Sequence, residues 1–454
     1  MRTIAAISTS PGVGGIGIVR ISGKNAFEII EKIFKPKGNS EIKAYTMKYG
    51  YIVDPKNEKI VDEVLVSYFF APKSYTTENM CEINSHGSSV VMRKILELCL
   101  ENGAVLAEPG EFTKKAFLNG RIDLSQAEAV IELINSKTEK EAEASINQLE
   151  GYLKTEINGI KTTILEIMTD IEASIDYPEY DIEEVTNENA LGKLDEIEAK
   201  LDKLEASFKN GKIIREGIKT AIIGTPNAGK SSLLNAILKE ERAIVTEFAG
   251  TTRDTIEEFI TIKGIPLKII DTAGIRDAQD EVEKIGIKKS KEIAESSDLV
   301  IAIFDGTKPL TEQDRQILEI IKNKQAIIII NKIDLAKKEV EREELEKYGK
   351  SIIEISALNK QGIEELYEEI TRIFSLNDVN LNDGVTITNV RHLELVKKAK
   401  NHAIKAKETI RNNMPIDIIA IDIKEIIESL NTITGENATE DIINEIFKKF
   451  CLGK

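Results

Sequence analysis

Long apolar runs, cysteine pairs and an excess of positive charge are all missing from this sequence of 454 residues. Apolar runs such as residues 326–330 are far too short to cross a bilayer, so no stable membrane insertion is expected. Residues 1–17 hold a short apolar stretch broken by Pro11 and several glycines, which is not the pattern of a secretory signal. Three cysteines are an odd number with neither metal-ligand nor disulfide spacing, which favours a cytoplasmic protein in a reducing compartment.

The charge balance is acidic. Lys and Arg total 61 against 77 Asp and Glu, which gives a formal net charge of −16. Much of the excess lies in residues 121–212, which carry 10 basic and 22 acidic side chains. The broad basic surface of a protein that holds nucleic acid unaided is therefore absent, and any RNA role requires a local patch or a partner.

The first part of the chain combines strand and helix patterns. Residues 1–118 mix short β-rich runs, such as 64–70, with one expected helix at 90–101, which indicates an α+β domain. Residues 125–148 are polar with recurring Ala, Ile and Leu and are expected to form one amphipathic helix. A further helix is marked by an apolar stripe at Leu191, Leu194, Ile197, Leu201 and Leu204.

The pattern changes at Gly217. Apolar strands now alternate with helical stretches such as 230–238 and 313–322, which indicates a doubly wound α/β sheet. The expected strands are residues 218–223, 259–262, 267–270, 299–304, 326–330 and 352–355. A polar linker at 375–384 precedes three more expected helices, at 389–412, 417–431 and 438–450.

Helices on both sides of an α/β segment suggest one helical domain interrupted by an insertion. The expected division is an N-terminal α+β domain, a helical domain in two parts, and an inserted phosphate-loop domain of Ras-like type. Their limits are residues 1–118, 119–216 with 378–454, and 217–377.

A phosphate-binding loop opens the inserted domain. The segment Gly224-Thr-Pro-Asn-Ala-Gly229-Lys230-Ser231 follows an expected strand and begins an expected helix, as this motif requires. Its glycines let backbone N–H groups approach phosphate oxygens, Lys230 supplies positive charge, and Ser231 offers a hydroxyl to Mg²⁺. Alone, the motif could be a glycine-rich turn.

Four more motifs follow in the order of a GTPase. Asp271-Thr-Ala-Gly274 comes after a strand and places a carboxylate near the metal. Asn331-Lys-Ile-Asp334 ends another strand, where the Asp334 carboxylate can accept two N–H bonds from guanine, a pattern that adenine does not offer. Ser356-Ala-Leu358 ends the next strand, and Gly250-Thr-Thr-Arg-Asp254 offers a hydroxyl to Mg²⁺. Five ordered motifs predict a domain that binds GTP with Mg²⁺.

The hydrolysis machinery is unusual, because Ile275 stands where Ras-like proteins carry a glutamine that orients water. Either turnover is very slow or another group takes this role. The candidates in the following loop are Arg276, Asp277, Asp280, Glu281 and Glu283, and each could equally be a solvated loop charge.

Motifs outside the GTPase segment are more specific. They are Gly14-Gly-Ile-Gly-Ile-Val-Arg20-Ile-Ser-Gly23, Cys81-Glu82-Ile-Asn-Ser-His86-Gly87, Pro109-Gly-Glu-Phe-Thr-Lys-Lys-Ala-Phe-Leu-Asn119, Asp123-Leu-Ser-Gln-Ala-Glu128 and Cys451-Leu-Gly-Lys454. With the GTPase motifs, they make the chain resemble the MnmE (TrmE) family of tRNA-modification GTPases over essentially its whole length.

The resemblance implies a folate-binding N-terminal domain that dimerises, and a G domain inserted into a helical domain. It implies 5,10-methylene- or 5-formyl-tetrahydrofolate as cofactor, the flavoprotein MnmG as partner in a heterotetramer, and tRNA as substrate. The modified position would be carbon 5 of the wobble uridine, which receives a carboxymethylaminomethyl or aminomethyl group. The folate-contacting residues would be Arg20, Glu82, Arg121 and Lys454, although each could be only a surface charge or a local ion pair.

The resemblance also addresses the missing glutamine. A K⁺ ion would supply the charge that an arginine finger supplies elsewhere, with Asn227, Thr246, Phe248 and Thr251 as ligands. Glu283 would position the attacking water. From the residues alone, Asn227 could be merely a turn former.

Together, the motifs and the resemblance assign the following residues. GTP binding is expected at Asn227, Ala228, Gly229, Lys230, Ser231, Ser232, Thr246, Glu247, Phe248, Ala249, Gly250, Thr251, Thr252, Asp271, Thr272, Ala273, Gly274, Asn331, Lys332, Asp334, Ser356, Ala357 and Leu358, and Mg²⁺ ligation at Ser231 and Thr252.

Two residues keep two interpretations. Cys451 is either a small buried hydrophobe beside Phe450 or, by the resemblance, a catalytic thiol near the folate. His86 is expected to be a hydrogen-bonded structural histidine rather than a catalytic one. The alternative function for the whole chain is a regulatory or assembly GTPase that binds ribosome or RNA and catalyses only GTP hydrolysis. Such a switch would be expected to carry a basic tail, which the sequence lacks.

Overall fold

The computed structural model describes residues 2–38, 41–176, 183–240, 258–270, 283–336, 339–374, 385–412 and 414–454. The chain forms two compact units. The first consists of Met1–Ile131, Gln148–Asp181 and Thr409–Lys454, and the second of Glu132–Asn147 and Ile182–Glu408. Several limits of these two units fall inside helices and differ from the domain limits expected from the sequence. The expected division into three domains, with the helical domain in two parts, therefore stays a prediction.

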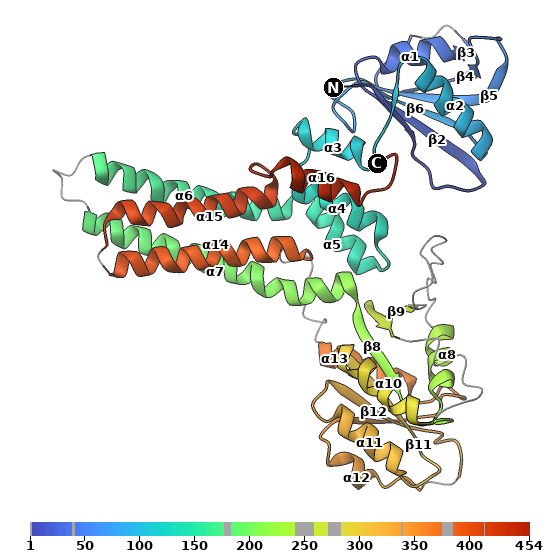
Figure 1. Ribbon diagram of the computed structural model, residues 1–454, viewed down its shortest axis with the longest axis vertical. Coiled ribbons are helices and arrows are strands. Elements are labelled where there is room, and N and C mark those ends of the chain that lie inside the picture. Colours follow the sequence, from blue (N-terminus) through green and yellow to red (C-terminus); the bar gives the residue numbers. More distant parts are fainter. Residues whose placement is uncertain are drawn as a thin grey trace. The chain divides into compact units, whose positions relative to one another are not determined.

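A mainly antiparallel sheet organises the first unit. Among the described residues its seven strands lie in the order β3-β4-β5-β6-β2-β1-β7, and only β7 pairs in parallel, with β1 (Figure 1). The strands are β1 Ile4–Ile7, β2 Gly14–Ser22, β3 Phe34–Pro36, β4 Thr46–Val53, β5 Ile60–Phe69, β6 Met80–Gly87 and β7 Val105–Leu106. Helices α1 (Ala26–Ile33) and α2 (Ser89–Glu101) bury apolar faces against it, as the expected α+β pattern requires.

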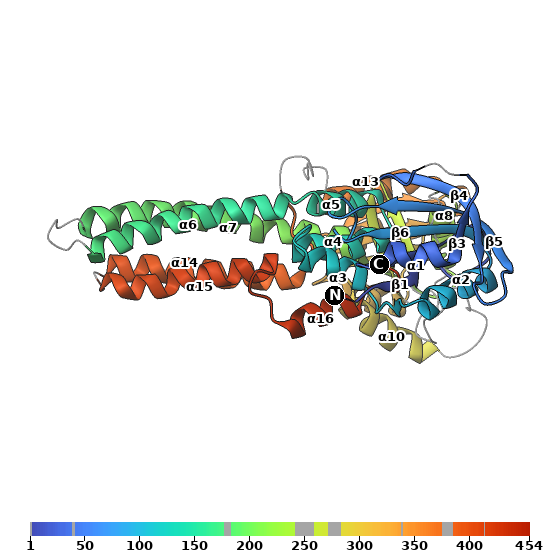
Figure 2. The ribbon, with the colours of Figure 1, turned by 90° about the horizontal axis from the view of Figure 1, so that it is seen from above.

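Both ends of the chain lie beside α3 (Glu111–Leu118), as Figures 1 and 2 show. The last helix, α16 (Glu440–Lys448), contacts α3. Phe447 and Phe450 are buried there with Ala116 and Leu124. Burial of one such aromatic side chain contributes roughly 1.5–3 kcal/mol, and the C-terminal segment is thereby fixed to the N-terminal part.

Long amphipathic helices build the rest of the helical region. In the first unit α6 (Tyr152–Asp176) runs beside α15 (Ile416–Thr434), as both views show (Figure 2). Their buried residues recur every three or four positions, on α6 at Leu153, Ile157, Ile160, Ile164, Ile167 and Ile171, and on α15 at Ile419, Ile423, Ile426, Leu430 and Ile433. This period places one apolar stripe on each helix.

In the second unit α7 (Glu183–Glu216) carries the expected stripe at Leu194, Ile197 and Leu201. Ion pairs join it to α14 (Val390–Arg411): Lys400 lies 2.5 Å from Asp202, and Lys407 bonds both Asp195 and Glu198.

The single helix expected at residues 125–148 is wrong, because the structure has two helices there, α4 (Leu124–Asn135) and α5 (Glu139–Leu149). The hydroxyl of Ser136 donates to a carbonyl in the last turn of α4 at 2.8 Å. Thr138 accepts from the Glu141 N–H at 3.1 Å, and the Glu141 carboxylate accepts from the Lys137 N–H at 2.7 Å. These side chains compete with the helical ladder and restart it, in the manner of a capping box.

A second sheet organises the GTPase segment. Its six strands among the described residues lie in the order β13-β12-β11-β8-β10-β9, parallel except for the antiparallel pair β9 and β10. They are β8 Ile218–Ile223, β9 Glu258–Ile262, β10 Ile265–Ile269, β11 Leu299–Asp305, β12 Ala326–Asn331 and β13 Ser351–Ile355. Each expected strand is confirmed to within two residues. The helices are α8 Lys230–Glu240, α10 Glu283–Ser296, α11 Glu312–Ile321, α12 Arg342–Glu346 and α13 Ile363–Phe374.

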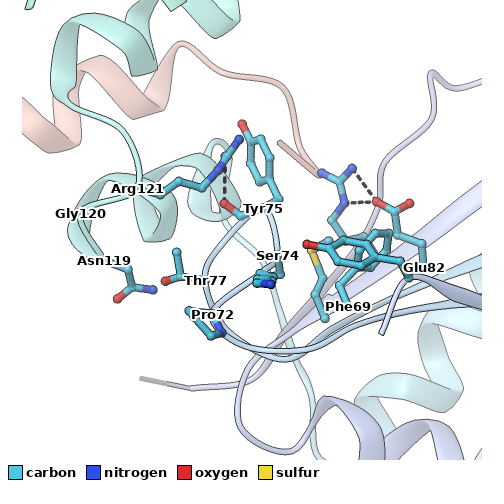
Figure 3. A pocket seen from close by; sticks show the side chains of 13 residues that line it. Phe69, Pro72, Ser74, Tyr75, Thr77, Glu82, Asn119, Gly120 and Arg121 are labelled. Carbon is cyan, nitrogen blue, oxygen red and sulfur yellow. Dashed lines mark hydrogen bonds and ion pairs between the residues drawn. The ribbon is translucent and has the colours of Figure 1, made fainter. Parts of the chain in front are cut away.

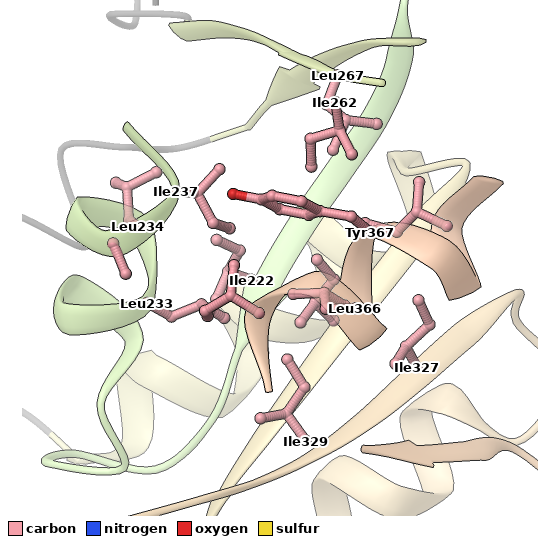
Figure 4. Packing of buried hydrophobic residues seen from close by; sticks show 14 of the residues in the cluster. Ile222, Leu233, Leu234, Ile237, Ile262, Leu267, Ile327, Ile329, Leu366 and Tyr367 are labelled. Carbon is pink, nitrogen blue, oxygen red and sulfur yellow. The ribbon is translucent and has the colours of Figure 1, made fainter. Parts of the chain in front are cut away.

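Both faces of this sheet are buried. Alternate residues of β11 and β12, such as Ile303 and Ile329, pack in the cluster with α8 and α13, part of which Figure 4 shows. Phe304 and Ile328 pack in the opposite cluster with α11. Strands buried on both faces are continuous apolar runs. Two covered faces confirm the doubly wound fold. Among the described residues, no helix has the length and apolar character needed to cross a membrane.

Candidate functional site

The nucleotide motifs meet at one edge of the second sheet. Cross-strand register pairs Asp305 with Asn331, and Asn331 with Ile355, so the segments that follow β11, β12 and β13 emerge side by side. Strand β8 lies between β10 and β11. After β8 the chain first adds β9 and β10 on one side of it and then β11, β12 and β13 on the other. The carboxyl ends of the strands at such a switch point are where doubly wound sheets bind ligands.

The phosphate loop has the backbone conformation that its glycines predict. Gly229 has φ +109°, and a Cβ atom there would lie 2.0 Å from Nδ2 of Asn331. A Cβ on Gly224 would lie 2.5 Å from the Ile303 carbonyl oxygen. Only glycine fits at such distances, so the loop stays close to the sheet and its N–H groups form a cradle for phosphate.

Lys230 lies inside this loop. Its Nζ donates to the carbonyls of Gly224 at 2.8 Å and Thr225 at 2.9 Å. Burial lowers the pKa of the lysine, because desolvation penalises its charged form. A partly desolvated cation held at the first turn of a helix is a ready partner for phosphate oxygens.

Asn331 holds two loops together. Its Nδ2 donates to the Ala228 carbonyl at 2.9 Å, and its Oδ1 accepts from the Ala357 N–H at 3.0 Å. Asn331 is only 3% exposed, so water does not reach its amide, and these two bonds satisfy the buried polar atoms instead. The residue thus fixes the phosphate loop relative to the base-recognition loops.

The predicted base-recognition residues lie at the surface. Asp334 and Leu358 are exposed, whereas Ser356 is buried and accepts from the Asn359 N–H at 3.2 Å. The Lys332 ammonium pairs with Asp305 at 2.6 Å. Burial opposes ionisation of Asp305, but hydrogen bonds from Lys332 and Thr307 outweigh it and lower the pKa of this carboxyl.

Part of the predicted site lies outside the described residues. This applies to Thr246, Glu247, Phe248, Ala249, Gly250, Thr251, Thr252, Asp271, Thr272, Ala273 and Gly274. Glu283 begins α10, but its side chain is likewise outside what the structure describes. Asn227, whose φ is +63°, is exposed, and Ser231 and Ser232 follow in the first turn of α8. The donor set present fits GTP, and among the described residues the Ser231 hydroxyl is the one that would hold Mg²⁺.

A separate cavity of about 700 Å³ lies in the first unit (Figure 3). Arg20, Glu82 and Arg121 all line it, so three of the four predicted folate residues meet in one place. Its wall combines these charges with aromatic and polar side chains from the loop before β6 and the segment after α3. The other lining residues are Tyr45, Phe69, Pro72, Lys73, Ser74, Tyr75, Thr77, Met80, Asn119 and Gly120.

Arg20 and Glu82 face each other across β2 and β6. The Arg20 Nε and Nη2 atoms both bond Oε1 of Glu82, at 2.9 and 2.8 Å. Both side chains are largely buried, so the pair is held in one geometry. In the described part of the chain nothing donates to Oε2 of Glu82, so this oxygen can accept from a ligand N–H.

Arg121 reaches the cavity from the segment after α3. Its guanidinium lies over the Tyr75 ring, 4.6 Å from the centroid, and donates to the Tyr75 carbonyl at 3.0 Å. The side chain is exposed, and the structure describes no carboxylate bonded to it. Arg121 is therefore a cation available to a ligand anion.

The C-terminal tail is docked on the N-terminal sheet and at the start of α3. The Gly453 carbonyl accepts from Ser8 Oγ at 3.0 Å and from Arg20 Nη1 at 3.1 Å. The carbonyls of Cys451 and Lys454 accept from backbone N–H groups on either side of the start of α3. The tail lies flat because these four bonds tie its backbone down.

Lys454 lies near the charged pair at the cavity. Burial lowers the pKa of its ammonium, and the positive charge of Arg20 lowers it further, against the opposing effect of Glu82. Lys454 does not line the cavity itself, but these interactions place it close to two residues that do.

The cysteines differ in environment. Cys451 is exposed, so the interpretation as a small buried hydrophobe is wrong. Cys81 and Cys99 are buried in the N-terminal core, where desolvation raises the pKa of each thiol, that of Cys99 to about 12. Among the three thiols, only Cys451 is accessible to a reaction partner.

His86 is hydrogen-bonded, as expected. Its Nδ1 lies 2.7 Å from Oδ1 of Asp62, whose other oxygen accepts from the His86 N–H at 2.8 Å. The hydrogen bond to Asp62 raises the pKa of this histidine.

Sequence reasoning missed three residues of these sites. Asp305 ends a strand at the same edge as Asn331, so the rule that found Asn331 could have found it. Gly453 was visible as the glycine of the terminal motif, but only the geometry shows that a Cβ there would lie 2.3 Å from the Ile7 carbonyl. Tyr75 stands in a loop without periodicity, and no sequence signal marks its contact with two arginines.

The doubly wound fold, the phosphate loop and the ordered motifs define a GTP-hydrolysing P-loop protein. Family models extend this to the rest of the chain. The model described as GTP-binding protein TrmE N-terminus matches residues 3–121, and the MnmE helical domain model matches residues 124–451. The chain belongs to the MnmE (TrmE) family of tRNA modification GTPases.

Relatives agree over the full length. The chain is 50% identical to the tRNA modification GTPase MnmE of Acetivibrio thermocellus, over 100% of this chain and 99% of the relative. It is 52% identical to that of Thermoanaerobacter pseudethanolicus and 50% identical to that of Clostridioides difficile, with the same coverage. Among solved structures, the G domain of the T. maritima iron transporter FeoB is 28% identical over 35% of this chain and 98% of that chain, with a TM-score of 0.26.

Proposed function

We propose that this GTPase is stimulated by potassium and acts with the flavoprotein MnmG. Together they would add a carboxymethylaminomethyl or aminomethyl group to carbon 5 of the tRNA wobble uridine, using the one-carbon unit of a tetrahydrofolate. The observation that supports this proposal most is the cavity lined by Arg20, Glu82 and Arg121, next to the docked tail with Lys454 and Cys451.

The cavity has the donors and acceptors that a folate needs. An exposed guanidinium at Arg121 suits a glutamate carboxylate, which such a group binds in bidentate fashion. Oε2 of Glu82 suits a pterin N–H. Lys454 adds a further cation close to the Arg20–Glu82 pair, and Cys451 supplies an accessible thiol near Lys454. A bound tetrahydrofolate would supply the one-carbon unit.

The GTPase site has residues for two cations. Ser231 would hold Mg²⁺ together with Thr252, and Asn227 would hold K⁺ together with Thr246, Phe248 and Thr251. In the described part of this set, Asn227 is exposed at the loop, where its amide oxygen is free to ligate. Glu283 would orient the attacking water in place of the missing glutamine.

Potassium dependence has a direct test. GTP turnover is expected to be fast in KCl and slow in NaCl at equal ionic strength, because Na⁺ is too small for a ligand cage of carbonyl and amide oxygens. The Asn227→Ala variant should lose the difference between the two salts. Equal turnover of the parent protein in the two salts would exclude a role for K⁺.

The proposed partners are a second copy of this chain through the N-terminal domain, MnmG and tRNA. The acidic charge of −16 favours this arrangement, since a chain without a broad basic surface gains from a partner that holds the RNA.

Mass spectrometry of tRNA nucleosides tests the function as a whole. A strain lacking this protein should lose the modified wobble uridine and regain it with the parent gene. Complementation should fail with Lys230→Ala, which removes the phosphate-binding cation, and with Arg121→Ala, which removes the guanidinium held over Tyr75 in the cavity. Normal modification in the strain without the protein would refute the proposal.

A further inference from the structure

Tyr75 is the residue that connects the two arginines of the cavity. The Arg20 guanidinium carbon lies 5.6 Å from the centroid of its ring, and that of Arg121 lies 4.6 Å from it. Both distances are within the range of attraction between a cation and an aromatic face. The ring and both arginines line the same cavity (Figure 3).

The ring itself is held in place. The hydroxyl groups of Tyr75 and Thr113 are hydrogen-bonded at 2.9 Å, and Thr113 is completely buried in α3. Tyr75 also packs at the margins of two apolar clusters, one of which contains Phe112 and the other Phe450. A side chain anchored at its tip and along its ring offers a rigid surface to the cations.

Arg121 depends most on this surface. The described contacts of its guanidinium are both to Tyr75, one to the ring and one to the main-chain carbonyl. An arginine side chain has many rotamers, and ordering it only when a ligand arrives costs conformational entropy. Its position over the ring orders the guanidinium beforehand. In its described contacts only an Nη1 N–H is used, by the Tyr75 carbonyl, so the other N–H donors stay available to a ligand.

Arg20 is held differently. Glu82 and the Gly453 carbonyl take three of its N–H bonds, and the rings of Tyr75 and Phe112 each lie 5.6 Å from the guanidinium carbon. Removal of the Tyr75 ring would therefore disturb Arg20 less than Arg121.

We propose that Tyr75 is a positioning residue of the cavity, which orders the Arg121 guanidinium for a ligand carboxylate and, to a smaller degree, supports Arg20. The inference rests on the proposed folate function of this cavity. The ring carries the effect, and the hydroxyl serves only to hold the ring.

Calorimetric titration with 5-formyltetrahydrofolate tests this role. Tyr75→Leu should weaken binding about tenfold, because the ring that orders the cation is lost. Tyr75→Phe keeps the ring and should bind within about threefold of the parent. Tyr49→Leu is the matched control, because Tyr49 is exposed on β4, outside the cavity, and should leave affinity unchanged. Melting temperatures of all variants verify that the first unit is folded.

A double-mutant cycle distinguishes positioning from direct contact. If Tyr75 acts through Arg121, Tyr75→Leu should cost clearly less in an Arg121→Ala background than in the parent. Equal losses in the two backgrounds would overturn the inference, and so would parent-like affinity of Tyr75→Leu. If the parent protein itself does not bind the folate, the proposed function fails first and the inference fails with it.

Discussion

We expect single residues to carry much of the specificity of this protein, and Asp334 is the clearest case. Its carboxylate is exposed at the nucleotide edge of the second sheet, so replacing it should not disturb the fold. Asp334→Asn should weaken GTP binding by about two orders of magnitude or more and favour xanthosine triphosphate, whose ring exchanges a donor for an acceptor. Calorimetric titration with both nucleotides measures this. Equal affinity of the parent for ATP and GTP would contradict the assignment.

Gly453 is a residue whose role is set by its backbone. Its φ is +87°, and a Cβ would lie 2.3 Å from the Ile7 carbonyl oxygen. We expect Gly453→Ala to destabilise the first unit by roughly 1–3 kcal/mol, through backbone strain and loss of the docked tail. Gly159→Ala is the control, because this helical position has open space around it and should gain roughly 0.5–1 kcal/mol. Thermal unfolding compares the two, and equal melting temperatures would contradict the docking.

His86 predicts a pH dependence. Its bond to Asp62 raises its pKa above the unfolded value, so its stabilisation is full below that value and is lost as pH rises through the folded pKa. His86→Gln should therefore lower the melting temperature of the first unit more at about pH 5.5 than at about pH 8.5. The effect is small because the imidazole is exposed. An equal difference at both pH values would show that the charged pair does not form.

At the scale of elements, the terminal tail belongs to the N-terminal sheet and α3. Deletion of residues 451–454 removes hydrogen bonds made by three tail carbonyls, each worth about 0.5–1.5 kcal/mol, so the melting temperature of the first unit should fall by several degrees. GTP turnover should persist, since the tail and the nucleotide edge belong to different compact units. Calorimetry and a phosphate-release assay measure the two effects, and an unchanged melting temperature would contradict the docked conformation.

Elements with strong apolar periodicity could be predicted from the sequence. Strand β12 begins with one alanine and four isoleucines, and α15 has a regular stripe, because burial of these residues determines their structure. The break between α4 and α5 could not be predicted in the same way. It depends on hydrogen bonds of Ser136 and Thr138, and such residues are also found inside helices.

The residues of the candidate sites likewise differ in whether a local sequence pattern predicts them. The phosphate loop and Asn331 follow local rules for strand ends and helix starts, so the sequence predicted them. Tyr75 and the docking of Gly453 depend on contacts between segments far apart in the chain, which no local pattern records. The grouping of Arg20, Glu82 and Arg121 was predicted only through the family resemblance, and the cavity provides its physical reason.

At the scale of the whole molecule, the two candidate sites lie in two different compact units of one chain. The second unit holds the GTP site, and the first holds the cavity with the docked tail. Under the proposed function, the GTP site and the cavity both serve one reaction on tRNA. Variants of either site should therefore give the same loss of modified nucleoside, although only those of the GTP site change nucleotide affinity.

The most direct test follows the one-carbon unit itself. The protein, MnmG, tRNA, GTP and Mg²⁺ are combined in potassium buffer with methylene-tetrahydrofolate that carries an isotopic label in its one-carbon unit. Nucleosides are then analysed by mass spectrometry. We expect the label in the substituent at carbon 5 of the wobble uridine. No labelled nucleoside should form with Arg121→Ala or in sodium buffer. Modified uridine without the label would contradict the central claim that the cavity binds the folate donor.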